Sequence, residues 1–573
     1  MRPRARSISL AALLSLLSAF AQAEPALDHL PDDALGFVLI RNLEATNAKI
    51  EGVTKIFQEI SPMPIPAPLP VLKAATGLGE GLNEQGDALL AFLPGDDQAA
   101  VPRPLLVVAV SDYAAFAASV NGDATGEVCR VTIAGEEILV AKRGTHAVLM
   151  NVEHRERLEA LLTAAPKPPA ALAPLADWLA KIDVAAVLTP RGVELLTTMG
   201  RQQLADQGPD MDESLRETLE MYETVLEFLG AELTIAAAGI AIDDQSNVKL
   251  VSQAILKNEG ALKGVAASPA AEFSPLAGYP DEPYVMAAGG PIPPAYGQAT
   301  AGFMRRLIEA NPETHGFQKL TDKEWQELED SWKDAMRGIR SLSMAVLTGG
   351  KDDPLYSNVY SVMKVDDAAK YLDVYAKSME KWNELLAETT TDIDLNYEIK
   401  KAEVAGKKAL LMTANFGAVA DDPNVPMIKP MMQAMFGEDA TMRMYLVAVD
   451  DTTVVLGVSS EEDVAAAVKK IADGETGLGD ASATQTTLKL LDAKSPWIGV
   501  LSPQGTVAWI TRFYDKFLAH LGQGMPKIPE YPDTSPIGFA VDFSEGRLST
   551  EMVWPVDALR GLAAYIKTVQ ESF

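Results

Sequence analysis

Four oxygen-bearing residues near the middle of the chain have the spacing of ligands in a calcium-binding loop. Asp392, Asp394 and Asn396 alternate along the sequence, and Glu403 falls at the twelfth position, where such loops place a bidentate carboxylate. Tyr397 stands at the sixth position, where the sharp turn of the loop calls for glycine. The sequence leaves two interpretations open: a weak calcium site, or an acidic loop between a helix and a strand.

Methionines are concentrated in a second segment, at Met427, Met431, Met432, Met435, Met442 and Met444. Thioethers one helical turn apart can hold Cu(I), but no His or Cys lies within the segment to complete such a site. Methionine side chains are flexible and polarizable, and they commonly form adaptable apolar surfaces. We therefore expect a helix over residues 427–436 whose methionines at 427, 431, 432 and 435 contact the body of the protein, a partner or a hydrophobic ligand. The alternative is that these methionines bind copper.

Catalytic signatures are missing from the sequence. The five histidines, His29, His146, His154, His315 and His520, show no metal-ligand spacing among themselves. The chain also has no His-Glu-x-x-His, Cys-x-x-Cys, Gly-x-Ser-x-Gly or Walker motif. We expect surface or turn roles for the histidines, no catalytic residues and no bound cofactor, so the sequence favours a protein that is not an enzyme.

Composition limits the classes of partner. The 573 residues include 49 basic and 79 acidic side chains, a formal net charge of −30, which repels nucleic acid and anionic lipid. A hydrophobic content of 48% and a charged content of 22% are typical of globular domains. The sequence therefore predicts an unknown protein or a hydrophobic molecule as partner and no nucleic acid.

The first 23 residues have the pattern of a secretory signal peptide. Arg2, Arg4 and Arg6 precede an apolar run over residues 8–20, and Ala21-Gln22-Ala23 supplies the small-x-small cleavage pattern. The apolar run is shorter than the ~20 residues that span a bilayer, and no later segment is long and apolar enough. We expect a mature chain that is exported to the periplasm or the extracellular space and does not span the membrane.

Cys129 is the only cysteine, so no disulfide can form within the chain. It alternates with Val131 and Ile133 in a segment that is typical of a strand. We expect a buried small side chain rather than a reactive thiol.

Similar segments recur in the same order in the two halves of the chain. Residues 88–116 match the segment 255 positions later, and Val187–Gly192 match Val500–Gly505, each a strand followed by a hydroxyl residue, Pro and Gly. Further matches join Pro31-Asp32 with Pro280-Asp281, Ile133–Gly135 with Val404–Gly406, Val148–Val152 with Val454–Val458, and Gly239–Asp243 with Gly538–Asp542. The order predicts an internal duplication, with copies at residues 24–268 and 269–573 that form a pseudo-symmetric pair.

The strand-like segments follow one another with few crossover helices, which favours antiparallel pairing. In the first copy we expect strands at 36–41, 87–93, 104–110, 127–133, 137–142, 146–152, 183–189, 232–242 and 247–256, and helices at 46–59, 112–120, 153–163, 190–206 and 211–229. The proline-rich stretches 62–70 and 166–174 are typical of extended loops. The predicted fold class is α+β, with two tandem, distantly similar halves that have antiparallel sheets and packed helices.

The signal segment, the opening Leu30-Pro31-Asp32-Asp33-Ala34 before a strand, and two long α+β copies resemble the large secreted bacterial proteins that are grouped as domains of unknown function. The resemblance is architectural, covers most of the mature chain and implies no activity.

Three functions remain open. The first is a non-catalytic binding or scaffold protein, which predicts a solid interior with an exposed apolar patch between the halves or around residues 427–444. The second is a carrier of a hydrophobic small molecule or lipid, which predicts an apolar cavity of several hundred Å3. The third is a hydrolase with a site assembled from distant residues, which predicts a buried acid beside a hydroxyl or His in a cleft.

Overall fold

The computed structural model describes residues 25–572 with the exception of 59, 61–66, 78, 96–101, 134, 207–212, 261, 267–275, 277, 280–281, 298, 303–304, 306–320, 390–396, 417–427, 474–476, 493–494, 520–526 and 545. The chain forms two compact units. Unit 1 consists of Met1–Thr54, Pro64–Gly192 and Gly239–Ala241, and unit 2 of Lys55–Met63, Val193–Ala238 and Ile242–Phe573. The expected division between residues 268 and 269 follows the sequence repeat and stays a prediction.

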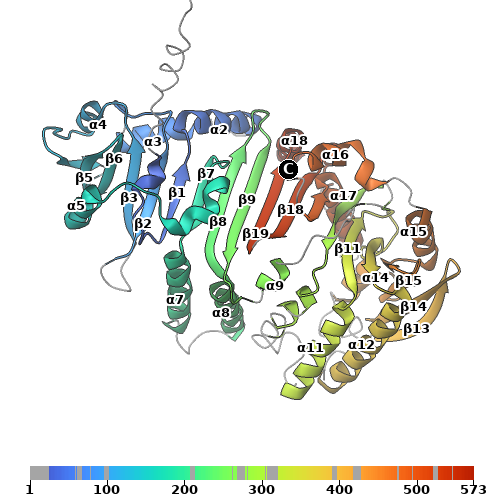
Figure 1. Ribbon diagram of the computed structural model, residues 1–573. Coiled ribbons are helices and arrows are strands. Elements are labelled where there is room, and N and C mark those ends of the chain that lie inside the picture. The colour runs from blue at the N-terminus through green and yellow to red at the C-terminus, as the bar shows by residue number, and fades with distance from the viewer. Residues whose placement is uncertain are drawn as a thin grey trace, which may run out of the picture. The chain divides into compact units, whose positions relative to one another are not determined.

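Unit 1 is built on an antiparallel sheet with the strand order β7-β1-β2-β3-β6-β5-β4 (Figure 1). Its strands are β1 (Gly36–Ile40), β2 (Ala88–Leu93), β3 (Arg103–Ala109), β4 (Val128–Ile133), β5 (Glu136–Arg143), β6 (His146–Asn151) and β7 (Val184–Leu188). The helical segments of this part of the chain are η1 (Ala26–His29), α2 (Leu43–Phe57), α3 (Pro68–Thr76), α4 (Tyr113–Ser119), η2 (Val152–His154), α5 (Arg155–Thr163), η3 (Ala170–Leu175) and α6 (Ala176–Leu179).

Helix α4 covers part of one face of this sheet. Asp112 caps it, because its carboxylate accepts hydrogen bonds from the backbone N–H groups of Ala114 (2.9 Å) and Ala115 (3.1 Å). Phe116, fully buried, packs in one core cluster with strand side chains that include Cys129. The helix is only 7 residues long, and Asn121 follows it with a φ of 61°, a left-handed conformation that ends helices.

Unit 2 has a longer antiparallel sheet, with the order β9-β19-β18-β17-β10-β11-β12-β16-β15-β14-β13. Its strands are β9 (Val248–Leu256), β10 (Tyr284–Pro291), β11 (Ile339–Leu347), β12 (Val359–Val365), β13 (Tyr397–Val404), β14 (Lys407–Asn415), β15 (Thr441–Ala448), β16 (Thr453–Val458), β17 (Trp497–Leu501), β18 (Ile537–Ser544) and β19 (Arg547–Trp554), and β8 (Leu233–Ile242) precedes them in the chain. Its helical segments include α7 (Pro190–Asp206), α8 (Glu213–Glu232), α9 (Leu262–Ala266), α11 (Asp322–Met336), α12 (Ala368–Thr389), α14 (Ile428–Phe436), α15 (Glu461–Asp473), η4 (Leu478–Asp480), α16 (Ser482–Leu488), α17 (Pro503–Ala519) and α18 (Val556–Ser572).

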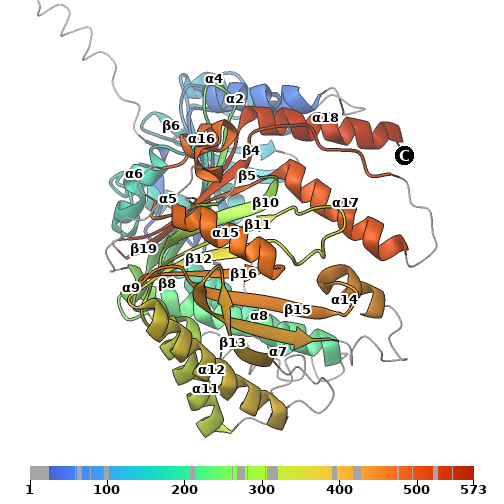
Figure 2. The ribbon, with the colours of Figure 1, turned by 90° about the vertical axis from the view of Figure 1, so that its right-hand side faces the viewer.

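The two faces of the unit 2 sheet are covered by different helices. Helix α15 contributes Val464 and Val468 to the core cluster on one face. Helix α12 contributes Tyr371 and Leu372 to the cluster on the other face. Helix α11 lies beside α12 (Figures 1 and 2), and the Ser378 hydroxyl donates to the backbone oxygen of Ser331 at 3.2 Å. The outer side of α12 is therefore held by a second helix.

The strands of the two units pair in the same order, so that β4-β5-β6-β3-β2-β1-β7 corresponds to β14-β15-β16-β12-β11-β10-β17. A rung is a set of residues directly opposite one another across neighbouring strands. One rung of unit 1 joins Ala185, Leu39, Leu89, Val107 and Val148. The matching rung of unit 2 joins Ile498, Gly289, Ser343, Val362 and Val455.

These rungs can be compared with the sequence matches. Val107 and Val362 lie 255 positions apart, and Ala185 and Ile498 lie 313 apart, which are the separations of the two longest sequence matches. Leu89 and Ser343 lie only 254 apart, so the match of residues 88–116 is wrong by one residue over β2. The match of Val148 with Val454 is wrong by one residue, because Val455 occupies the rung of Val148. A slip of one residue in a strand exchanges its two faces, so the correction matters for side-chain comparisons.

The match of Ile133–Gly135 with Val404–Gly406 also joins different turns. Val404–Gly406 belong to the turn between β13 and β14, whereas pairing order equates β4 with β14. Strand β13 is thus an additional edge strand of unit 2.

The described residues confirm the α+β class and the antiparallel sheets. The predictions of extended loops at 62–70 and 166–174 are wrong in part, because α3 begins at Pro68 and η3 begins at Ala170. Proline at the first position of a helix is tolerated, since that residue has no intrahelical acceptor for an N–H group. None of the described helices combines the length and the apolar character that a membrane span requires.

Candidate functional site

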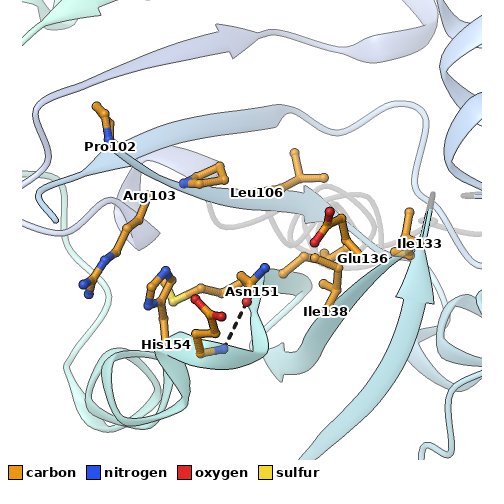
Figure 3. A pocket seen from close by; sticks show the side chains of 12 residues that line it. Pro102, Arg103, Leu106, Ile133, Glu136, Ile138, Asn151 and His154 are labelled. Carbon is orange, nitrogen blue, oxygen red and sulfur yellow. Dashed lines mark hydrogen bonds between the residues drawn. The ribbon is translucent and has the colours of Figure 1, made fainter. Parts of the chain in front are cut away.

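A groove of about 600 Å3 opens at one end of the unit 1 sheet (Figure 3). Residues from four strands, from η2 and from the segment before β3 line it: Pro102, Arg103, Pro104, Leu106, Ile133, Glu136, Ile138, Leu149, Met150, Asn151, Glu153 and His154. The apolar members form the larger part of the lining, and the charged members are few. The volume and the lining match those of sites that bind small apolar molecules or apolar side chains.

Strand pairing explains why the apolar side chains converge. Leu106 on β3 lies directly opposite Leu149 on β6, so their side chains share a face of the sheet. Ile138 on β5 shares that face, because Leu149 pairs with Val140 two residues further along. The floor is half-buried at Leu106 and Ile138 and packs on the same core cluster as α4.

The polar side chains lie at the rim. Figure 3 places Arg103 and His154 toward one end and Ile133, Glu136 and Ile138 toward the other. The Asn151 side chain accepts a hydrogen bond from the backbone N–H of Glu153 at 3.0 Å. This bond caps η2 and so fixes the backbone position of His154, the last residue of η2.

His154 is half-buried, and burial holds the pKa of its imidazole below the ordinary 6.5. The nearby Arg103 and Arg157 guanidinium groups lower this pKa further, against the opposing effect of Glu153. At neutral pH the neutral imidazole is therefore favoured, and Arg103 is the cationic member of this end of the groove.

The groove does not resemble a hydrolytic site. Its two carboxylates, Glu136 and Glu153, are exposed to solvent. Glu232, a buried acid elsewhere, accepts a hydrogen bond from the backbone N–H of Leu262 at 2.9 Å, at the start of α9. That contact gives Glu232 a structural role at a helix terminus.

A second apolar region lies on unit 2, where α14 and α17 contact one another. We call it the α14–α17 surface, defined by Tyr356, Phe436, Ile510, Phe513 and Tyr514. The Tyr356 and Phe436 rings lie 5.7 Å apart between centroids, and Phe513 packs edge-on against Tyr514 at 5.9 Å. Tyr356, Ile510 and Tyr514 are 46%, 37% and 40% exposed, so aromatic and aliphatic groups here face solvent.

The methionines predicted as an interaction surface fall beside this region. Met431, Met432 and Met435 are half-buried on α14. Met427 lies outside the described residues. The helix expected over 427–436 is described from Ile428 to Phe436.

The calcium candidate stays a prediction. Asp392, Asp394 and Asn396 lie outside the described residues, and Glu403 is exposed on β13. Within the described part of the chain, no group of three or more His, Cys, Asp or Glu residues is arranged to hold a metal ion.

The expected surface or turn roles are wrong for His29 and His146. The two side chains are 0% and 1% exposed, and His29 Nε2 lies 3.0 Å from His146 Nδ1. They are 117 positions apart, and η1 packs against β3 and β2 while β6 pairs with β3. The sequence spacing therefore held no signal of the contact, and only the apolar context of each residue could have suggested burial.

The burial predicted for Cys129 is confirmed. The residue is 6% exposed on β4, and burial raises the pKa of its thiol above the ordinary value.

Because the thiolate is the reactive form, we expect Cys129 to resist an aromatic disulfide reagent in the native protein and to react with one equivalent after denaturation. Absorbance of the released thiolate measures both rates. Complete reaction of the native chain at the rate of the denatured chain would contradict the assignment.

Comparison with protein-family models, with curated proteins and with solved structures finds no match to this chain.

Proposed function

We propose that this chain is a non-catalytic binding protein whose ligand occupies the groove of unit 1. The observation that supports the proposal is the groove itself, about 600 Å3 with an apolar floor. A ligand that covers the apolar floor would remove apolar surface from water, and the free energy of binding would gain roughly 25 cal/mol per Å2 of this surface. Such binding requires no catalytic group. The exposed carboxylates at the rim argue against the hydrolase hypothesis.

Export and duplication form part of the same proposal. The pattern of residues 1–23 supports secretion to the periplasm or the extracellular space, where a binding protein meets ligands outside the cell. The matching rungs of the two units support descent from one duplicated ancestor.

The test uses a dye that fluoresces in apolar surroundings, 8-anilinonaphthalene-1-sulfonate, with the full mature chain. We expect saturable binding that weakens about tenfold in Ile138→Gln, since one buried aliphatic contact of that size is worth roughly 1.4 kcal/mol. Ile138 is half-buried on the groove floor, so its replacement removes apolar contact without opening the core.

The matched control is Tyr514→Gln, which changes an exposed apolar residue of the α14–α17 surface. Unchanged dye affinity in this variant supports the groove. Loss of binding in Tyr514→Gln with full binding in Ile138→Gln would contradict the proposal. It would favour a second candidate, a scaffold that holds a partner protein on the α14–α17 surface, which the solvent exposure of Tyr356, Ile510 and Tyr514 supports.

A further inference from the structure

The two units differ at one equivalent place, on the face of the sheet that carries the groove floor. Rung by rung, Leu106 and Leu149 of the groove floor correspond to Ser361 and Leu456 of unit 2. Ile138 lies opposite Val131, and its counterpart Met444 lies opposite Met412. The groove floor therefore has a matching surface on the unit 2 sheet.

The helices that follow β3 and β12 begin alike. Asp112 and Asp367 both cap with their carboxylates, the second accepting from the backbone N–H of Lys370 at 2.9 Å. At the same separation of 255 positions, Phe116 and Tyr371 are both buried against the sheet. The first two turns of α4 and α12 thus occupy equivalent places.

The helices end very differently. Helix α4 has 7 residues and stops before Asn121, whereas α12 has 22 residues and continues to Thr389. The additional residues extend α12 by about 22 Å at 1.5 Å per residue. Met379 of this extension packs against the same core cluster as Met444 and Leu456, the counterparts of the groove floor. Tyr375, the first residue of the extension, corresponds to Val120, which is buried in the core of unit 1, so the uncovered place begins after it.

We propose that the groove of unit 1 receives an amphipathic helix of a partner protein, in the place where unit 2 carries the C-terminal part of its own helix α12. The inference rests on the proposed function, because it names the occupant of the same groove. Met379 and Trp382, which lie beyond the place of Val120, have the spacing i and i+3, one of the spacings with which helices present apolar anchors to a groove. The partner helix is expected to carry aromatic or long aliphatic residues at this spacing.

The probe is a labelled synthetic peptide of residues 375–389, fixed as a helix by a hydrocarbon staple on its polar face. We expect it to bind the full mature chain by fluorescence anisotropy and to displace the dye from the groove. Its affinity should fall about tenfold in Ile138→Gln and stay unchanged in Tyr514→Gln. A control peptide with serine at the positions of Tyr375, Met379 and Trp382 should not bind.

The outcomes separate the two proposals. Ile138→Gln could weaken dye binding while the peptide does not bind the unchanged chain at concentrations up to about 1 mM. In that case the groove holds a small apolar molecule and the helix inference is wrong. Peptide binding that Ile138→Gln does not weaken places the peptide elsewhere and also overturns the inference. If neither dye nor peptide binds the folded chain, the proposed function itself is wrong.

Discussion

Acidification from pH 6.5 toward pH 3 is expected to destabilise unit 1 by up to about 5 kcal/mol through the buried pair His29 and His146. Burial lowers the pKa of His29 to about 3, and the positive charges of His146 and Arg143 contribute to the shift. The unfolded chain takes up this proton near pH 6.5, whereas the folded chain resists it until about pH 3. The folded state therefore has its full stability above pH 6.5 and loses it progressively as the pH falls.

The geometry of the pair supports this sign. With His29 Nε2 only 3.0 Å from His146 Nδ1, one ring must donate and the other accept, so a proton added to the accepting nitrogen would bring two N–H groups face to face. The other groups around the pair do not offset this repulsion fully. Arg143 is 7% exposed and adds positive charge, while the Asp87 carboxylate raises the pKa of His146 against the larger lowering effect of burial.

Hydrogen exchange of the amides in residues 25–35 and 144–151, corrected for intrinsic rates, measures the local stability between pH 7 and pH 4. The variant His29→Gln should abolish most of the pH dependence at a cost of roughly 1–2 kcal/mol at pH 7, since it keeps a hydrogen-bonding group but loses the imidazole contact. His154→Gln is the matched control, because His154 is only half-buried. An equal pH dependence in the native chain and in His29→Gln would contradict the assignment to this pair.

Most strands of unit 1 could be predicted from sequence because alternation of apolar and polar residues is a local property. Strand β7 was expected at 183–189 and runs from Val184 to Leu188, and helix α7 was expected at its observed bounds, 190–206. The hydroxyl residue before Pro190 contacts the start of this helix, because the backbone N–H of Gly192 donates to Thr189 Oγ1 at 3.2 Å. Each of these features depends on residues that are close together in the sequence.

The groove and the histidine pair could not be predicted in this way. The groove depends on the early end of α4 and on side chains of four strands that only the pairing register brings together. The histidine contact depends on the packing of η1 against strands that lie far along the sequence. Exact register was also beyond the sequence, as the one-residue error at Val148 and Val454 shows, because repeated valines align almost equally well in either position.

Replacing either of two equivalent glycines by alanine is expected to lower the stability of the fold, because each lies against a backbone oxygen. A Cβ at Gly192 would lie 1.7 Å from the backbone oxygen of Leu35, and one at Gly505 would lie 1.8 Å from the backbone oxygen of Tyr284. Neither oxygen belongs to a side chain that can rotate away, so β1 and β10 would have to move from α7 and α17. We expect Gly192→Ala and Gly505→Ala each to cost roughly 3 kcal/mol or more.

The effects should be confined to the strands next to the changed glycine. Gly192→Ala should accelerate amide exchange in β1 and β7, where the backbone N–H of Thr189 donates to Leu35 at 3.1 Å. Gly505→Ala should do the same in β10 and β17, where the backbone N–H of Ser502 donates to Val285 at 2.8 Å. Gly79→Ala is the control, since a Cβ there meets no atom within 4 Å. An added methyl group cannot share the space of a backbone oxygen without moving it. If the amides of these strands exchange as slowly in Gly192→Ala and Gly505→Ala as in the control, the close approach of helix and strand is wrong in both units.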